Sequence, residues 1–482
     1  MNVPAPKFMI ESTWSGRLFG GEWSSAAGGS LDVLEPATGK RLTQVGAATA
    51  ADVRKAASEA RAAQPGWAAT PYETRAAILR KAARHLEENQ EELVSWIARE
   101  TGGIPAKAGF EIHLVTEILY RSSAMCTEPQ GLVLPSDPGR ISLARRVPRG
   151  VIGVISPFNF PLILSMRAVA PALATGNSVV LKPARQTPLT ALKLCEIFLE
   201  AGLHPDAISC LTGPGDVLGD ALCADPRVRK ISFTGSSETG EQITRVAGVK
   251  KLSLELGASC PVVILPDADI ELAASAIAGG GYTNAGQVCI SVQRVVADRR
   301  VIADLLDALV PKVEAIKLGD PSDPDTALGS LISERDAIRV EAALREGSAN
   351  GAQIVTGGER SGSVLTPAVV TNVDPSGPLS QDELFGPAVA LSTASDVDHA
   401  VELANSTRYG LAAGIFTSDL RNAIRFVREV DAGTLHVNWT PLWRADLMPY
   451  GGLKGSGIGQ EGPRYAVREM TDSKTVVLHG AL

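Results

Sequence analysis

The stretch Val151-Ile-Gly-Val-Ile-Ser-Pro-Phe-Asn-Phe-Pro161 decides the fold of this chain. Its first five residues are apolar and mostly β-branched, which favours a strand buried on both faces. Two prolines then fix the backbone around Asn159, and a stretch of helical length follows. Further apolar runs repeat this unit and alternate with helical stretches of about 10–15 residues: Ser178–Leu181, Ala207–Leu211, Lys230–Phe233 and Val262–Leu265. This alternation predicts an α/β protein with parallel sheets.

The regions on either side extend this prediction. Before the alternating part, residues 14–48 have the composition of short strands and turns. A first helix is expected to start at Thr49, a second to run from Thr70 to Glu100, and a third to span 106–126.

Later in the chain a second α/β series is expected, with strands near Gln293–Ala297 and Ala388–Leu391. Residues 140–149 alternate like a solvent-facing strand pair, and 474–478 form a β-rich segment near the last residue. Because no long linker or internal repeat separates these parts, we expect interleaved domains.

Composition excludes several classes of function. The 482 residues are 45% hydrophobic and 21% charged, and the net charge of −7 disfavours binding to nucleic acid or an anionic membrane. No segment approaches the roughly 18 apolar residues of a membrane span, and the first ten residues do not resemble a signal peptide. The six cysteines have neither C-x-x-C nor zinc spacing, so we expect no metal and a cytoplasmic location.

Three residues predict covalent chemistry. Cys289 ends the small-residue turn Asn284-Ala-Gly-Gln-Val-Cys289, and Glu255 stands beside a glycine earlier in the chain. A lone cysteine is most often a buried apolar residue. A thiol with a carboxylate, however, is suited to covalent catalysis followed by hydrolysis. Asn159, held at a strand end, can donate to a developing oxyanion.

Two glycine-rich turns predict a nucleotide site. Gly213-Pro-Gly-Asp-Val-Leu-Gly219 follows a strand and opens a helix, with one residue more than the dinucleotide fingerprint. Phe233-Thr-Gly-Ser-Ser-Glu-Thr-Gly240 is a second such turn, whose hydroxyls and free N–H groups suit a phosphate. Because the carboxyl ends of parallel strands form a crevice, the two turns support each other.

Taken in order along nearly the whole chain, seven motifs resemble the aldehyde dehydrogenase superfamily. They are Pro157-Phe-Asn-Phe-Pro161, Lys182-Pro183, Phe233-Thr-Gly-Ser236, Leu254-Glu-Leu-Gly257, Gly286-Gln-Val-Cys289, Glu383-Leu-Phe-Gly-Pro387 and Pro449-Tyr-Gly-Gly-Leu-Lys454. Each motif alone is a weak signal, but their common order and spacing are specific. The segment Ser156–Lys182 is similar to benzaldehyde-type members, and the stretch Cys289–Arg294 is similar to lactaldehyde-type members.

The resemblance implies a three-part chain. Residues 1–127 and 149–257 would form a Rossmann-like cofactor domain, and 258–448 an α/β catalytic domain. Residues 128–148 and 470–482 would form a small β oligomerisation ribbon that makes the protein a homodimer or homotetramer.

The resemblance also implies oxidation of an aldehyde to a carboxylic acid with NAD or NADP. Cys289 would be the nucleophile, Asn159 with the Cys289 N–H the oxyanion donor, and Glu255 the base that activates water. Relatives that transfer the acyl group to coenzyme A typically lack this glutamate, so water is the expected acceptor.

The resemblance implies cofactor contacts along the strand ends and turns, with Lys182 at the adenosine ribose, Ser236 at the pyrophosphate, and Glu383 with Phe385 at the nicotinamide half. The residues are Ile155, Ser156, Pro157, Phe158, Lys182, Ala184, Arg185, Gly215, Gly219, Phe233, Thr234, Gly235, Ser236, Thr239, Leu256, Gly257, Glu383 and Phe385. Many family members carry a Glu where this chain has Arg185. Because an arginine can pair with a 2′-phosphate, we expect NADP to be accepted.

A mostly apolar substrate pocket favours an aromatic or medium-size aldehyde. Its expected residues are Phe160, Leu164, Arg167, Val288, Ile290, Trp439, Trp443 and Tyr450. Arg167 or Arg444 could instead bind the anion of a semialdehyde, or Arg167 could pair with a protein carboxylate.

Functions of another class stay open at this stage. They are a non-catalytic member of the fold, a coenzyme A acyltransferase and an esterase using the same thiol. The retained Asn159, Glu255 and Cys289 argue against the first, and Glu255 argues against the second.

Overall fold

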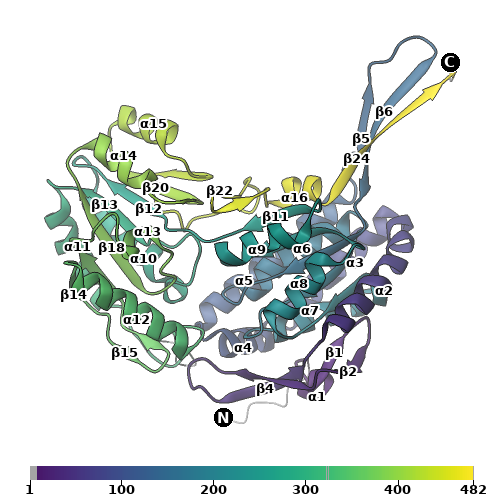
Figure 1. The fold of residues 1–482 in the computed structure, drawn as a ribbon, viewed down its shortest axis with the longest axis horizontal. Helices are drawn as coiled ribbons and strands as arrows, with labels where there is room; N and C mark the ends of the chain where they lie inside the picture. Colours follow the sequence, from purple (N-terminus) through teal and green to yellow (C-terminus); the bar gives the residue numbers. More distant parts are fainter. Residues whose placement is uncertain (1–7, 322, 324, 481–482) are drawn as a thin grey trace.

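A computed structural model describes residues 8–321, 323 and 325–480. Residues 1–7, where no signal peptide was expected, and 481–482, the end of the expected ribbon, lie outside the described residues. Two α/β lobes lie side by side, and a β ribbon projects from one of them and carries the C-terminal end of the chain (Figure 1).

The first lobe is built on an eight-stranded sheet of order β2-β1-β9-β8-β7-β10-β11-β23. The strands are β1 (Arg17–Phe19), β2 (Trp23–Ser25), β7 (Val151–Ile155), β8 (Ser178–Lys182), β9 (Ile208–Cys210), β10 (Val228–Thr234), β11 (Lys251–Glu255) and β23 (Gly457–Ile458). The five central strands from β9 to β11 are parallel, as the apolar runs predicted. The strand β11, which ends on Glu255, was not among the predicted strands.

Helices cover this sheet (Figure 1). They are α2 (Ala50–Ala69), α3 (Tyr72–Glu88), α4 (Gln90–Thr101), α5 (Pro105–Met125), α6 (Pro161–Ala174), α7 (Leu189–Ala201), η1 (Pro205–Ala207), α8 (Gly215–Ala224) and α9 (Ser237–Ala247). The N-terminal part adds α1 (Glu11–Trp14) and the hairpin β3 (Ser30–Leu34) with β4 (Arg41–Gly46), which confirms short strands over 14–48.

The predicted single helix from Thr70 to Glu100 is wrong. Thr70 ends α2, and its hydroxyl donates back to the Gly66 carbonyl. The helix then breaks at Asn89, whose side chain donates to the His85 carbonyl and so competes with the backbone hydrogen bond there. The expected helix start at Thr49 is confirmed, and Thr49 and Asp52 form a capping box there.

The second lobe contains a seven-stranded sheet of order β14-β17-β18-β13-β12-β20-β21, parallel except for β14. Its strands are β12 (Pro261–Ile264), β13 (Arg294–Asp298), β14 (Gln353–Thr356), β17 (Ala368–Thr371), β18 (Ala388–Ala394), β20 (Ala412–Phe416) and β21 (Thr434–Val437). The helices are α10 (Ile270–Tyr282), η2 (Thr283–Gly286), α11 (Ile302–Glu314), α12 (Glu334–Ala349), α13 (Pro378–Gln381), α14 (Val397–Asn405) and α15 (Leu420–Glu429).

Short strand pairs and the ribbon complete the fold. The pairs are β15 (Arg360–Ser361) with β16 (Val364–Leu365) and β19 (Tyr409–Gly410) with β22 (Leu453–Lys454). After α16 (Pro463–Glu469), β24 (Thr471–His479) pairs antiparallel with β6 (Arg140–Pro148), which also pairs with β5 (Gly131–Leu134). The expected β segments near 140–149 and 474–478 therefore lie in one sheet.

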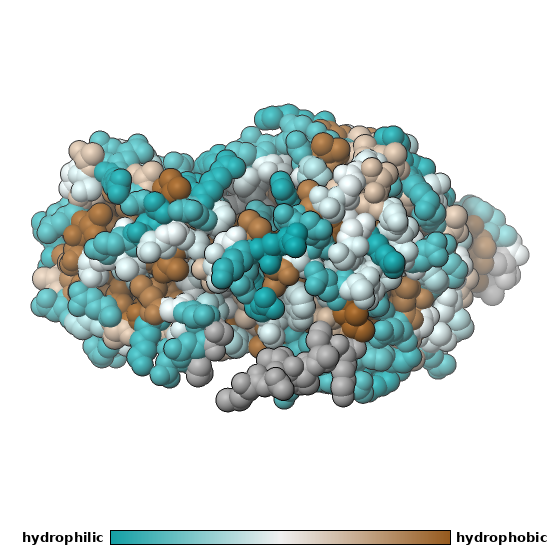
Figure 2. All heavy atoms as spheres, turned by 90° about the horizontal axis from the view of Figure 1, so that it is seen from below, coloured by the Kyte–Doolittle hydropathy of each residue, from teal (hydrophilic) through white to brown (hydrophobic). Residues whose placement is uncertain are grey.

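The surface mixes polar and apolar residues. Figure 2 shows the molecule from below, with hydrophobic patches between hydrophilic ones over the second lobe at left. Exposed apolar side chains also lie on the ribbon, where Leu132 and Val133 are 69% and 78% exposed. In the part of the chain that the structure describes, no helix has both the length and the apolar character needed to cross a membrane.

Candidate active site

The carboxyl ends of four neighbouring strands form one row in the first lobe. Lys182 at the end of β8 is in register with Ile155 of β7, which is in register with Phe233 of β10. Thr234 is in turn paired with Glu255 at the end of β11. The sheet therefore gathers motifs that are far apart in the sequence along one edge, as the parallel arrangement predicted.

Cys289 is presented by a loop with unusual backbone geometry. Asn284, Ala285 and Gly286 have φ angles of 53°, 56° and 68°, three left-handed residues in succession. A Cβ on Gly286 would lie 2.0 Å from the carbonyl oxygen of Gly386. Glycine is thus required here because the cysteine loop packs backbone to backbone against the Glu383–Pro387 turn.

Cys289 is half-buried, and one side chain contacts its sulfur while another contacts its backbone carbonyl. The hydroxyl of Tyr450 lies 3.6 Å from its sulfur, and the thiol of Cys260 donates to its carbonyl oxygen at 3.5 Å. Burial raises the pKa of Cys289 to about 11, although the hydrogen bond with Tyr450 opposes this shift. All six cysteines are described and free, and the other five are buried.

Asn159 reaches the same loop from the first lobe. Its side-chain amide donates to the Gln287 carbonyl at 2.9 Å, and its own carbonyl accepts from the Asn284 amide at 3.3 Å. The Gln287 side chain is fixed by the N–H of Ile332. The Asn159 amide, which is expected to donate to an oxyanion, therefore contacts the cysteine loop two residues before Cys289.

Glu255 is buried and its Oε2 has no hydrogen-bond partner among the described residues. Burial, reinforced by the charge of Glu461, raises the pKa of Glu255 well above its ordinary value, while Arg444 and Arg167 oppose the shift. A carboxyl of raised pKa has the property that a general base near neutral pH needs.

One pocket brings the thiol together with the expected nicotinamide-side residues. Cys289, Glu383, Phe385 and Gly286 are among the residues that line it. The Glu383 carboxylate accepts the N–H of Ala258 at 3.0 Å, and burial raises its pKa to about 7. The ring of Phe385 packs edge-on against Phe158 at 5.9 Å between centroids.

The glycines around this pocket leave room for a bound group. A Cβ on Gly257 would lie 2.8 Å from the Glu383 carboxylate, so the backbone of the Leu254–Gly257 motif runs directly beside it. At the β8 end of the row of strand ends, Lys182 is 7% exposed, and a Cβ on Gly215 would lie 3.8 Å from its ammonium nitrogen. The buried ammonium of Lys182 lies beside the start of α8, and the Glu383 carboxylate lies beside the backbone of Gly257. This arrangement fits the sugar and phosphate groups of a dinucleotide.

The remaining expected cofactor residues follow the same edge. Ser236 caps α9 by accepting the N–H of Thr239, and the Gly235 N–H donates to the Glu255 carbonyl. Arg185 is exposed just after β8, and Gly219 lies inside α8. The others adjoin these strand ends: Ser156 and Pro157 after β7, Ala184 after β8 and Leu256 after β11.

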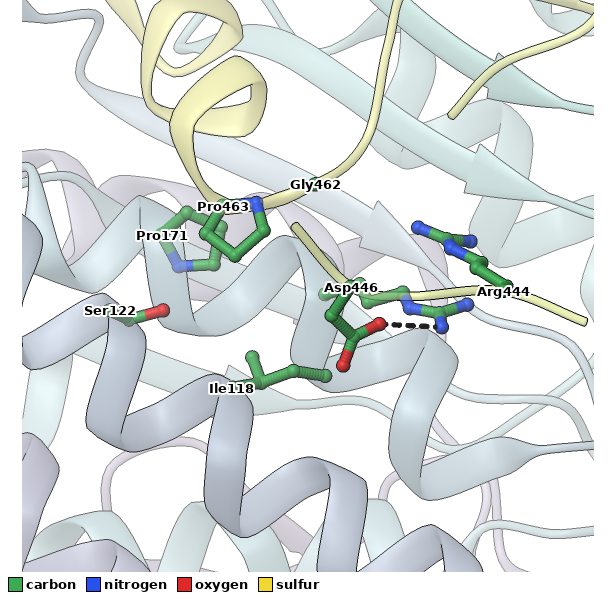
Figure 3. A pocket seen from close by; sticks show the side chains of 8 residues that line it. Ile118, Ser122, Pro171, Arg444, Asp446, Gly462 and Pro463 are labelled. Atoms are coloured by element: carbon green, nitrogen blue, oxygen red, sulfur yellow. Dashed lines mark hydrogen bonds and ion pairs between the residues drawn. The ribbon is translucent and has the colours of Figure 1, made fainter. Parts of the chain in front are cut away.

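Arg167 belongs to a buried ion-pair cluster that contacts Tyr450 through Arg444. It contacts Asp446 at 3.0 Å and Glu461 at 3.9 Å, while Arg444 contacts Glu461 at 3.1 Å and stacks 3.7 Å over the Tyr450 ring. Arg167, Arg444 and Asp446 also line a recess, in which Figure 3 labels Arg444 and Asp446. Of the two interpretations of Arg167, pairing with protein carboxylates is the one that occurs in this structure.

The other expected pocket residues divide by lobe. Leu164 packs on the core of the first lobe, and buried Val288 and Ile290 cluster with Tyr450 beside Cys289. Phe160 packs against both groups. Trp439 and Trp443 are 43% and 54% exposed, and Trp443 packs against His436. The two tryptophans therefore lie at the surface rather than in the apolar cluster around the thiol.

Several residues of the site were not expected. Asp446 and Glu461, which contact the two arginines, lie on either side of the Pro449–Lys454 motif and belong to none of the motifs. Cys260 had no expected role, yet it contacts the Cys289 backbone. Because these contacts join segments far apart in the sequence, no local signal could have revealed them. Among the described residues, no group of three or more His, Cys, Asp and Glu side chains could hold a metal.

Comparison with known proteins agrees with the motifs. The family model described as "Aldehyde dehydrogenase family" matches residues 23–476. Vanillin dehydrogenase from Amycolatopsis sp. is 38% identical over 98% of each chain. Benzaldehyde dehydrogenase [NAD(+)] from Pseudomonas putida is 38% identical over 96% of each chain. A 3-sulfolactaldehyde dehydrogenase from Priestia megaterium is 40% identical over 95% of this chain and 97% of its own length.

Solved structures show the same architecture. Betaine aldehyde dehydrogenase from Staphylococcus aureus in complex with NAD+ superimposes with a TM-score of 0.95 at 32% identity, covering 98% of this chain and 96% of the other. Glyceraldehyde-3-phosphate dehydrogenase from Methanocaldococcus jannaschii complexed with NADP gives 0.91 at 34% identity, covering 93% and 99%.

The chain belongs to the aldehyde dehydrogenase family, as the motifs indicated. The expected fold is confirmed, and so is the expected class of activity, an NAD(P)-dependent oxidoreductase acting on an aldehyde.

Proposed function

We propose that this enzyme oxidises an aromatic or medium-size apolar aldehyde to its acid, with Cys289 as nucleophile. One observation carries the proposal: a single pocket is lined by the Cys289 thiol together with Glu383 and Phe385, the residues expected at the nicotinamide half of the cofactor. Thiol and hydride acceptor would then face the same carbon atom.

The reaction begins at Cys289. Its thiol loses a proton to water and the sulfur attacks the carbonyl carbon, which gives a tetrahedral adduct with a negative oxygen. The Asn159 amide and the Cys289 N–H donate to that oxygen. When bound, NAD(P)+ accepts the hydride that leaves this carbon, and an acyl thioester remains on Cys289. Glu255 then takes a proton from water, whose oxygen attacks the thioester and releases acid and thiol.

The cofactor would lie along the row of strand ends, with Lys182 at the ribose, Ser236 at the pyrophosphate and Glu383 with Phe385 at the nicotinamide half. Arg185 is exposed beside Lys182, where a 2′-phosphate would project. We therefore propose that NADP is accepted as well as NAD.

The three-part division is also a proposal. Residues 1–127 and 149–257 form the cofactor domain, 258–448 the catalytic domain, and 128–148 with 470–482 an oligomerisation ribbon. The exposed apolar residues Leu132 and Val133 and the open edges of β5 and β24 support pairing with another subunit, because an uncovered edge is a template for strand addition. The assembly is a homodimer or homotetramer, and six free cysteines favour the cytoplasm.

Arg444 supports a second candidate substrate, an aldehyde with a distal anion. Its Nε and Nη2 atoms are buried and have no partner among the described residues. Its guanidinium stacks on the Tyr450 ring, and the Tyr450 hydroxyl contacts the thiol. An anion bound by Arg444 would therefore be separated from Cys289 by the Tyr450 ring. A 3-sulfolactaldehyde dehydrogenase among the relatives acts on an aldehyde of this kind.

A substrate panel separates the two candidates. Benzaldehyde, hexanal, lactaldehyde and succinic semialdehyde are each assayed with NAD and with NADP, with reduced cofactor as the readout. We expect the highest kcat/KM for benzaldehyde and an unchanged ranking in Arg444→Met. A preference for succinic semialdehyde that disappears in Arg444→Met would favour the anionic substrate instead.

A further inference from the structure

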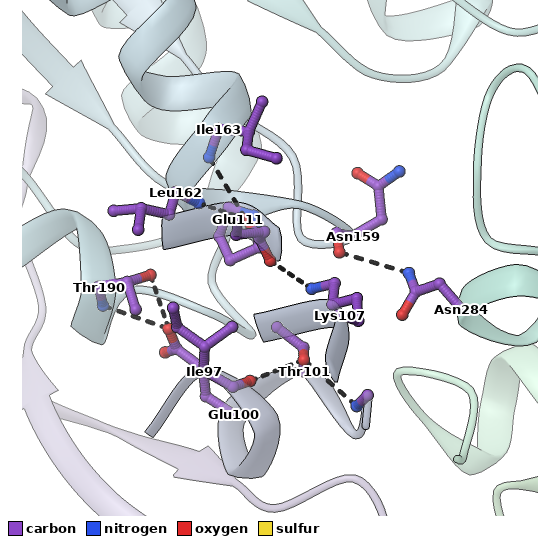
Figure 4. Close-up of polar contacts among 12 residues, drawn as sticks. Ile97, Glu100, Thr101, Lys107, Glu111, Asn159, Leu162, Ile163, Thr190 and Asn284 are labelled. Carbon is purple, nitrogen blue, oxygen red and sulfur yellow. Dashed lines mark hydrogen bonds and ion pairs between the residues drawn. The ribbon is translucent and has the colours of Figure 1, made fainter. Parts of the chain in front are cut away.

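A buried ion pair lies beneath Asn159. Lys107 and Glu111 stand one turn apart on α5, with their side chains 5% and 0% exposed and 2.5 Å between Nζ and Oε1 (Figure 4). Burying two charges costs several kcal/mol of desolvation, which is offset only when both ions are well paired. An apolar pair would fill the same space without that cost, so the charges call for an explanation.

The free oxygen of Glu111 holds the beginning of α6. Its Oε2 accepts the backbone N–H groups of Leu162 at 3.1 Å and Ile163 at 3.3 Å. No side chain of the helix itself caps this end, where Phe160 stands at the N-cap. Glu111 thus supplies from a distant helix the acceptor and the negative charge that a helix N-terminus favours.

Lys107 holds the other side of the same turn. Its ammonium lies 4.7 Å from the centre of the Phe160 ring, a cation–π contact in a desolvated place. Phe160 directly follows Asn159, whose carbonyl accepts from the Asn284 amide. The residue that bears the proposed oxyanion donor is therefore fixed from below by the ion pair and from the side by the cysteine loop (Figure 4).

We propose that Glu111 and Lys107 are positioning residues for Asn159. By holding the first turn of α6 and the Phe160 ring, they set the direction in which the Asn159 amide donates to the oxyanion. The inference rests on the proposed role of Asn159. A small displacement of such a donor is costly, because the hydrogen bond must meet the charge where it develops.

Glu100 is the matched control within the same chain. It is also fully buried, and it accepts the N–H groups of Leu189 and Thr190 and the hydroxyl of Thr190 at the start of α7. Glu100→Gln therefore replaces one buried carboxyl acceptor at one helix start, as Glu111→Gln does, but α7 bears none of the proposed catalytic residues.

The test is a double-mutant cycle on the full-length enzyme with benzaldehyde, or the aldehyde preferred in the panel. We expect Glu111→Gln to lower kcat about tenfold or more, with an unchanged Kd for reduced cofactor, whereas Glu100→Gln lowers the thermal midpoint but not kcat. In an Asn159→Ala background, Glu111→Gln should have little further effect on kcat, because the donor it positions is already absent. If Glu111→Gln caused only structural damage, its factor of loss in kcat would multiply with that of Asn159→Ala.

Equal losses of kcat in Glu111→Gln and Glu100→Gln, or independent effects in the cycle, would overturn the proposal. If Glu111→Gln does not fold, Lys107→Met takes its place in the cycle, with recovery of kcat in Lys107→Arg as the expected result and no recovery as the contrary one. A wild-type kcat in Asn159→Ala would instead show that Asn159 is not the oxyanion donor. This result is obtained from the single variant, so it is distinguishable from a failure of the proposal for Glu111.

Discussion

The hydroxyl of Tyr450 lies 3.6 Å from the sulfur of Cys289, and the ring that bears it is stacked under Arg444. This contact joins the thiol to the ion-pair cluster formed by Arg167, Asp446 and Glu461. The nucleophile therefore lies where the apolar part of the site meets a buried polar part.

The first prediction concerns the state of the thiol. Since burial raises the pKa of Cys289 to about 11, the thiolate is scarce at pH 7 in the protein without cofactor. Alkylation by iodoacetamide should accelerate about tenfold per pH unit between pH 7 and 10. Tyr450→Phe removes a hydrogen bond that lowers this pKa, so alkylation should slow about fivefold at pH 8. A rate independent of pH over this range would contradict the assignment.

Replacing the nucleophile tests the covalent step. Cys289→Ser should reduce the formation of reduced cofactor by about a thousandfold or more, because the hydroxyl is a far weaker nucleophile than the thiol. Cys223→Ala, which changes a buried thiol of the first lobe, serves as the control and should keep near wild-type activity. Comparable activity in the two variants would exclude Cys289 as the nucleophile.

The role of Glu255 predicts a kinetic signature. Glu255→Gln should give a burst of reduced cofactor close to one equivalent per active site and then stall, since acylation proceeds but the thioester is not hydrolysed. Stopped-flow absorbance at 340 nm measures the burst, and mass spectrometry should detect the acyl group on Cys289. Sustained wild-type turnover would show that another group activates water.

Arg185 predicts the cofactor preference. In Arg185→Glu the charge that would pair with a 2′-phosphate is reversed, so kcat/KM for NADP should fall about tenfold or more while that for NAD is kept. Arg335→Glu, an exposed substitution on α12, controls for the change in net charge. If the wild-type enzyme prefers NAD by more than a hundredfold, the proposed role of Arg185 is lost.

Gly286 predicts a cost in stability. Gly286→Ala places a Cβ against the carbonyl of Gly386 at a φ of 68°, and unfolding should become easier by about 2 kcal/mol or more. Gly279→Ala, in α10 with no atom within 4 Å of the added Cβ, should be neutral or slightly stabilising. Thermal midpoints of the two variants compare these effects directly, and equal midpoints would contradict the close packing.

Much of the fold followed from local sequence. Continuous apolar runs predicted β7, β8, β9, β10 and β12, because a strand buried on both faces is made mainly of apolar residues. The break at Asn89 was missed, since a single side-chain hydrogen bond decided it within a stretch of good helix formers. The strand β11 was missed because Lys251 and Ser253 interrupt its apolar run.

By itself the sequence determined the family, the strand–helix alternation and the candidates Cys289, Asn159 and Glu255, because these depend on residue type and order. Only the tertiary structure decided what surrounds them. It paired Arg167 with Asp446, placed Tyr450 against the thiol and brought Glu111 under the first turn of α6. Each of these contacts joins segments that are far apart in the chain, and their partners are chosen by packing and burial, which no local stretch of sequence records.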